Sequence, residues 1–181
     1  MGRTYDRLDE RLRRWIGRQP VFFMATAPSG PGGHVNLSPK GHADTFAILD
    51  GRTVAYLDLT GSGAETVAHL RDNGCITLML CAPSGPPRLY GNRRVVLPVL
   101  PGGRAMGRAG GAVPTRRGAR AVVVVQVERI ADSRGYVVPW YRHAGERDLL
   151  ASGWPTGTTP PTAPGATPPA STTSLPCPRP R

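Results

Sequence analysis

Long apolar runs are missing from this sequence, whose longest purely aliphatic stretch covers residues 121–125. A membrane-spanning helix needs about 18 apolar residues or more, so we expect no membrane span. Residues 1–6 become polar and charged at once, with no apolar signal core behind them. From these absences we expect a cytoplasmic protein that does not act in a membrane.

Cysteine is scarce, with three residues at positions 75, 81 and 177 and no framework spacing. An odd number of this kind is typical of thiols that are kept reduced. Cys75 and Cys81 lie in one predicted strand, where six residues separate them by about 20 Å, too far for a disulfide. We therefore expect both to fill the core as free thiols.

Acidic residues are also few, because 12 Asp and Glu stand against 23 Lys and Arg, for a net charge of +11. A strongly basic chain ordinarily suggests a nucleic-acid partner. Seven of these charges, however, are arginines within residues 99–120 and 152–181, which contain no acid. The remainder alternates Arg with Asp and Glu, as solvated surfaces do. This argues against nucleic acid, and an acidic-surface or nucleic-acid binder using residues 99–120 is kept only as an alternative.

Hydrophobic periodicity predicts a mainly β protein with flanking helices, in the α+β class. Apolar residues at three- and four-residue steps predict a first helix from Thr4 to Gly17. A second helix is predicted from Ser62, where Ser62 and Glu65 form a capping box, to a stop at Gly74. Runs rich in β-formers, with turn signals such as Asp50-Gly51, predict antiparallel strands in a small barrel. They cover residues 21–27, 34–38, 46–49, 52–59, 75–82, 88–97 and 120–130.

Two segments lack this patterning. Residues 98–119 are mostly Gly, Arg, Ala and Pro, and residues 152–181 contain nine prolines among Thr, Ser and Ala. Such compositions bury too little apolar surface to offset the entropy of ordering. We expect one domain over residues 1–150 with an irregular insert at 98–119, followed by a disordered Pro/Thr-rich tail at 151–181. A proline-rich docking tail and an out-of-frame reading of GC-rich DNA are alternatives.

Lysine occurs once, as Lys40, against 22 arginines. A compact ammonium retained in so arginine-rich a chain suggests a place near an anion, although a surface turn is the alternative. Asn36 and Ser38 precede Lys40 at steps of two residues, so on a strand all three line one face. An amide, a hydroxyl and an ammonium are thus expected along one groove, with Gly41 directly after them.

A second polar string runs from Thr60 to Thr66, where a strand is expected to pass into a helix. Gly61 and Gly63 let the backbone approach a ligand, and the start of a helix offers free N–H groups that suit phosphate. Hydroxyls at Thr60, Ser62 and Thr66 add donors. A capped turn without a ligand explains the same string.

Conventional catalytic motifs are absent. The four histidines lack metal-ligand spacing, the cysteines form no C-x-x-C pair, and neither a G-x-S-x-G elbow nor a P-loop occurs. No metal site and no catalytic residue is assigned. An enzyme built on this chain would take its chemistry from a cofactor.

The sequence resembles the pyridoxamine 5′-phosphate oxidase-like, FMN-binding split-barrel family. The resemblance implies a six-stranded antiparallel split β-barrel that homodimerises and holds FMN at the dimer interface. It places Ser38 and Lys40 beside the flavin, and Thr60, Ser62 and Thr66 near its phosphate. Asn36, Gly41, Gly63 and Arg88 complete the expected cofactor-binding set. The resemblance rests on residues 22–27, 34–41, 52–63, 65–66, 69–71, 88–91 and 122–129.

Departures from the family pattern bear on the substrate. Ala64 stands where relatives usually have Asn, and after residues 146–148 the chain becomes proline-rich where relatives continue into a helix. We therefore do not expect pyridoxamine phosphate as the substrate. The expected function is an FMN-dependent oxidoreductase acting on an unidentified small molecule. A non-catalytic flavin, deazaflavin or haem binding protein is the alternative.

Overall fold

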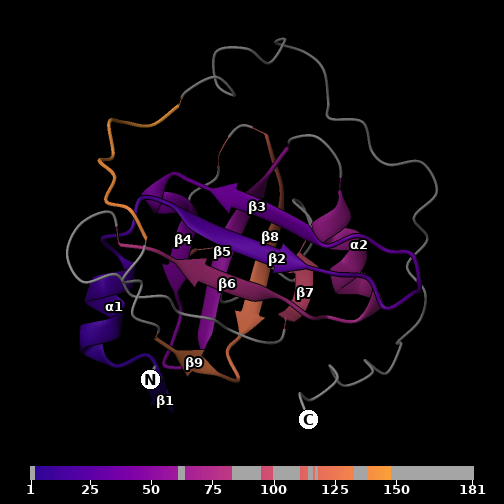
Figure 1. Ribbon diagram of the computed structural model, residues 1–181, viewed down its shortest axis with the longest axis horizontal. Helices are drawn as coiled ribbons and strands as arrows, with labels where there is room; N and C mark the ends of the chain where they lie inside the picture. Colours follow the sequence, from indigo (N-terminus) through magenta and orange to yellow (C-terminus); the bar gives the residue numbers. More distant parts are fainter. Residues whose placement is uncertain are drawn as a thin grey trace.

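β-Strands dominate the computed structural model of this chain (Figure 1). The structure describes residues 3–60, 64–82, 95–99, 111–113, 116, 118–132 and 138–147. Within these ranges the strands form three antiparallel sheets and are accompanied by two α-helices, which confirms the mainly β class. Hydrogen bonds do not join these described sheets into a closed barrel. The tail at 151–181 and most of the insert at 98–119 lie outside the described residues.

Three strands make the sheet that carries the lone lysine. Its order is β3 (Asn36–Lys40), β2 (Phe22–Thr26) and β6 (Thr77–Leu80), and both pairings are antiparallel. The predicted hairpin between β2 and β3 is confirmed, although β3 begins two residues later than expected. The register sets Phe22 opposite Lys40, Met24 opposite Ser38 and Thr26 opposite Asn36.

The second sheet has four strands in the order β4 (Phe46–Ile48), β5 (Thr53–Leu59), β8 (Ala119–Gln126) and β7 (Val95–Val99). The short 3-10 helix η1 (Ala43–Thr45) leads from β3 into β4. The predicted turn at Asp50-Gly51 connects β4 to β5, and the Asp50 side chain accepts a hydrogen bond from Arg52 N at 2.7 Å. Because β5 is central and covered on both faces, its residues 54–58 are all buried.

The N-terminal segment departs from the predicted helix. Residues Thr4–Tyr5 form strand β1, paired with β9 (Ile130–Ala131), and α1 runs only over Glu10–Ile16. Asp9 caps α1, because its Oδ1 accepts a hydrogen bond from Leu12 N at 2.8 Å. Tyr5 has the spacing of a helical apolar face, but its hydroxyl donates to Asp132 Oδ2 at 2.8 Å, next to β9. A tertiary contact thus overrides the periodicity at this end.

The second helix, α2 (Glu65–Asp72), also begins later than predicted. Its N-cap is Ala64, which makes no side-chain capping hydrogen bond, so the predicted capping box with Ser62 as N-cap is wrong. The predicted stop is confirmed, since Asn73 is the C-cap and Gly74 has φ +66°. The helices α1 and α2 lie at opposite ends of the sheets (Figure 1).

The main hydrophobic core lies between the two larger sheets and is closed by the helices. It combines Leu12 of α1, Met24 of β2, Leu78 of β6 and Val123 of β8, each essentially inaccessible to solvent. A smaller cluster, containing Ala55, Leu57, Val113 and Val122, covers the other face of β5. No described helix has the length and apolar character needed to cross a membrane.

The cysteines differ from expectation in one respect. Cys81 is a buried free thiol, as predicted, and burial raises its pKa. Cys75 is only half-buried and is disulfide-bonded to a partner outside the described residues. The prediction of a reduced Cys75 is therefore wrong. Its reasoning measured only the spacing to Cys81, which does not limit pairing with a distant part of the chain.

Replacing Asp9 by Ala removes the side-chain cap of α1. We expect Asp9→Ala to lower the free energy of unfolding by about 1 kcal/mol, the usual cost of losing such a cap. Urea denaturation followed by circular dichroism measures the change. Asp9→Asn keeps an oxygen acceptor and is the control, so an equal loss in both variants would show that the hydrogen bond to Leu12 N is not the cause.

Candidate functional site

Strand β3 directs its polar residues inward and its apolar residues outward. Asn36, Ser38 and Lys40 lie across from Thr26, Met24 and Phe22, which are all buried. Directly paired residues share a face of the sheet, so the predicted polar row is confirmed and borders the core. At about 3.3 Å per residue, it extends about 13 Å from Asn36 to Lys40. We call these three residues the β3 polar row.

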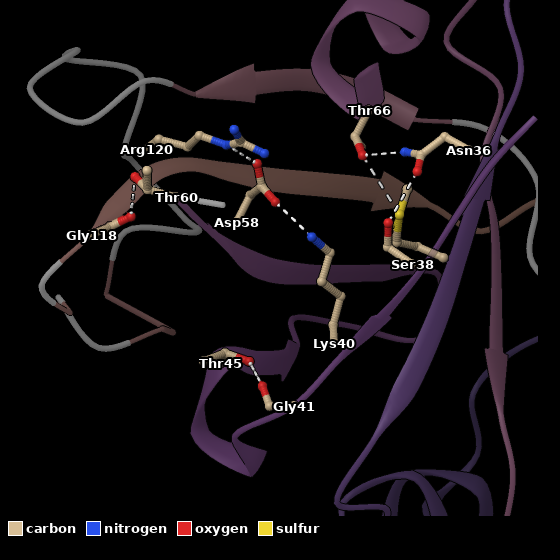
Figure 2. Close-up of polar contacts among 11 residues, drawn as sticks. Asn36, Ser38, Lys40, Gly41, Thr45, Asp58, Thr60, Thr66, Gly118 and Arg120 are labelled. Atoms are coloured by element: carbon tan, nitrogen blue, oxygen red, sulfur yellow. Dashed lines mark hydrogen bonds and ion pairs between the residues drawn. The ribbon is translucent and has the colours of Figure 1, made fainter. Parts of the chain in front are cut away.

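The Asn36 end of the β3 polar row is tied to the first turn of α2. Asn36 Nδ2 donates to Thr66 Oγ1 at 2.9 Å, and Ser38 Oγ donates to Asn36 Oδ1 at 3.0 Å. Thr66, itself buried, donates to the Met24 sulfur at 3.6 Å. Figure 2 shows these side chains converging below α2. The structure therefore joins three of the predicted site residues in one hydrogen-bonded group.

The Lys40 end reaches a carboxylate on the other large sheet. Lys40 Nζ lies 3.1 Å from Asp58 Oδ1, and Arg120 Nε lies 2.6 Å from Asp58 Oδ2. The Asp58 side chain is completely buried, whereas those of Lys40 and Arg120 are 21% and 24% exposed. We call these three residues the Asp58 triad (Figure 2). Two cations and one carboxylate give the triad a net charge of +1.

Sequence reasoning assigned no role to Asp58 and treated Arg120 only as one of the arginines of residues 99–120. A signal for Asp58 exists in the sequence, because it is an acid inside the apolar strand at residues 53–59. A carboxylate that shares a face with Val54 and Tyr56 must find a cationic partner or stay protonated. Which cations serve it depends on the register between β5 and β8 and on the approach of β3, which are tertiary features.

Thr60 lies beside the Asp58 triad but turns toward β8. Its backbone N and its Oγ1 both donate to the Gly118 carbonyl, at 2.6 and 2.8 Å. Gly118 has φ +79°, a conformation that favours glycine. The Gly41 carbonyl accepts a hydrogen bond from the buried Thr45 Oγ1 at 2.8 Å, which holds the turn after Lys40. The other predicted site residues, Ser62, Gly63 and Arg88, lie outside the described residues.

A buried phenol lies next to the triad. Burial raises the pKa of Tyr56, the nearby Asp58 charge raises it further, and Arg120 acts in the opposite direction. The hydroxyl is therefore protonated at neutral pH, and it has no hydrogen-bond partner among the described residues. In the same part of the chain, no three His, Cys, Asp or Glu side chains are grouped to hold a metal ion.

In chemical terms, the site combines a cationic end and a neutral polar end along one strand. Lys40 and Arg120 supply positive charge, and Asn36, Ser38 and Thr66 supply amide and hydroxyl groups about two turns of pleat away. Such an arrangement suits an elongated ligand that carries an anionic group and neutral hydrogen-bonding groups.

Comparisons with known proteins agree on one family. A family model described as pyridoxamine 5′-phosphate oxidase matches residues 8–134. The pyridoxamine 5′-phosphate oxidase family protein ustO of Aspergillus flavus is 41% identical over 139 residues, which are 75% of this chain and 55% of that protein. The chain thus spans about half the length of this curated relative.

Solved structures share the fold at low identity. The crystal structure of HupZ from Group A Streptococcus has a TM-score of 0.53 and 20% identity, covering 70% of this chain and 94% of that one. An FMN-binding protein from Syntrophomonas wolfei has a TM-score of 0.47 and 11% identity, covering 72% of this chain and 92% of that one.

The buried position of Asp58 predicts a strong effect on stability. Asp58→Ala leaves Lys40 and Arg120 without their shared counter-charge, so we expect the free energy of unfolding to fall by about 3 kcal/mol. Asp44→Ala is the matched control, because Asp44 is half exposed and pairs with Arg116 at 2.7 Å. A surface pair of this kind contributes about 1 kcal/mol or less. Chemical denaturation of both variants measures the contrast, and equal losses would contradict the assignment of a buried, shared carboxylate.

Proposed function

This chain belongs to the pyridoxamine 5′-phosphate oxidase family, and on that premise we propose that it is an FMN-binding oxidoreductase that acts on a small molecule. The observation that carries the proposal is the net positive Asp58 triad at one end of the β3 polar row. FMN has an anionic phosphate ester, a hydroxylated ribityl chain and a ring with amide-like edges. These features correspond in kind to a cationic end and a neutral polar end.

The described donors fit the chemistry of a phosphate ester. Lys40 and Arg120 are both cations with N–H donors, and the carboxylate of Asp58 compensates only one of the two charges. In the proposal, Lys40, Arg120 and Thr60 hold the phosphate side, and Asn36, Ser38 and Thr66 orient the neutral part. Gly41 keeps the turn after Lys40 in place, and Ser62, Gly63 and Arg88 are further proposed contacts.

FMN, when bound, supplies hydride or electron transfer. The residues of this chain bind and orient it, and the apolar surroundings of Asp58 and Tyr56 limit the access of water from the core side. The protonated Tyr56 hydroxyl and the ion-paired Lys40 keep their protons at neutral pH, which leaves the redox step itself to the cofactor.

A second candidate is a protein that holds a flavin, deazaflavin or haem without turnover. It is favoured by the pairing of the ionisable groups at the site. Lys40, Asp58 and Arg120 contact one another, which suits a binding role better than proton transfer. The two candidates share the binding site and differ in whether a reductant reaches the cofactor.

We further propose that the chain forms a homodimer with a six-stranded split barrel in each subunit. The supporting observation is the outer face of β3, where Val35 is 71% exposed and Leu37 is 62% exposed. In the described sheets β3 is an edge strand, paired only with β2. An edge strand with apolar residues outward is a surface that a second copy would cover.

Flavin binding gives the direct test of the proposed function. Titration of the purified chain with FMN is expected to quench flavin fluorescence and to leave a yellow protein after desalting. Anaerobic addition of NADH or NADPH is then expected to bleach the flavin absorption. Bleaching supports the oxidoreductase, binding without reduction by any donor favours the second candidate, and a colourless protein refutes both flavin proposals.

The proposed dimer predicts a change of mass in a single variant. Leu37→Glu places a charge on the outer face of β3, so we expect it to yield a monomer where the wild type is a dimer. Light scattering coupled to size exclusion measures the mass. Trp140→Glu is the control, because Trp140 is also a large exposed apolar residue but lies outside β3. A dimeric Leu37→Glu, or a monomeric wild type, would reject this interface.

A further inference from the structure

We infer that Asp58 is a positioning residue, which holds the ammonium group of Lys40 in place for the phosphate of the bound cofactor. The inference rests on the proposed function and extends it to a residue that need not touch the ligand. Its basis is the Asp58 triad, in which a completely buried carboxylate on β5 binds a cation from β3 on one oxygen and a cation from β8 on the other.

The donor inventory makes both oxygens of Asp58 necessary. Lysine and arginine side chains are donors only, so each needs an acceptor atom. A carboxylate offers one oxygen to each, but the isosteric Asn offers one oxygen and one N–H donor. In Asp58→Asn one of the two cations therefore faces a donor and is expelled.

Lys40 is the cation that leaves. Arg120 is carried by β8, which pairs directly with β5 at Asp58 and Ala121, and its contact is the shorter one at 2.6 Å. Lys40 reaches Asp58 at 3.1 Å from β3, which belongs to the other large sheet. Its long side chain is partly exposed and regains rotamer freedom in solvent.

The net charge near the ligand stays the same after this change. The intact triad carries +1, and Arg120 alone, once Lys40 has turned into solvent, also carries +1. The loss of a negative charge is thus balanced by the departure of a positive one. What Asp58→Asn removes is the ordered contact of Lys40 with the phosphate, so FMN binding becomes weaker.

The first test compares FMN with riboflavin, which lacks the phosphate. We expect Asp58→Asn to raise the dissociation constant of FMN about tenfold, the scale of ordering a lysine side chain, and to leave that of riboflavin unchanged. Lys40→Met is expected to do the same, and the double variant K40M/D58N to add nothing further. Equal FMN binding in wild type and D58N, or additive effects in the double variant, would overturn the inference. A loss of both flavins in D58N would show a general structural defect and would also overturn it.

The second test reads the lysine directly and needs no cofactor. Because Lys40 is the single lysine, lysine labelled with ¹⁵N at Nζ gives one side-chain ammonium signal. A hydrogen bond to a buried carboxylate is expected to slow its proton exchange, so the signal should be visible in the wild type and in the Asp44→Asn control but lost in Asp58→Asn. A signal that persists in D58N refutes the positioning role.

The two tests separate the inference from the proposed function. If the wild-type chain binds no FMN, the proposed function fails, and the cofactor role of Asp58 fails with it. If the wild type binds FMN while D58N binds it equally well, only the inference fails. Should D58N not fold, K40M and K40M/D58N are compared instead, and a difference in their FMN dissociation constants overturns the inference.

Discussion

The buried carboxylate of Asp58 is the constraint on which the arrangement of this site depends. An ionised carboxylate without solvent contact needs a full set of donors, and here the donors come from two other strands, one of them in a different sheet. The position of β3 relative to β5, and the start of β8, are therefore coupled. Thr60 and Gly118 reinforce the second coupling, since both donors of Thr60 end on one carbonyl.

Strand β3 is unusual because its two faces are inverted. Its polar residues face the core side and Leu37 and Val35 face outward, which a solvated monomer would not favour. Inside, each polar group is matched, Asn36 by Thr66 and Lys40 by Asp58. The inversion thus has a polar cause on one face and leaves an apolar surface on the other, which is why we link ligand binding and dimer formation to the same strand.

Local patterns in the sequence predicted much of the fold and one half of the site. The β2–β3 hairpin, the Asp50-Gly51 turn and the period-two row of Asn36, Ser38 and Lys40 depend on neighbouring residues, and the structure confirms them. The errors involve distant partners. Tyr5 fitted a helical face until Asp132 is considered, and Cys75 fitted a free thiol until the rest of the chain is considered. Asp58 was missed for the same reason, because its meaning depends on Lys40 and Arg120.

The triad also gives a physical reason for the single lysine among 22 arginines. Arg120 occupies one oxygen of Asp58 through Nε, and a second arginine at position 40 would present a planar fork that tends to bind both oxygens of a carboxylate. An ammonium group needs only one oxygen and keeps further N–H donors for another acceptor. Two different cations can therefore share one buried carboxylate, and the smaller one can still turn a donor toward a ligand. The composition of the chain and the geometry of its site are in this way consequences of the same carboxylate.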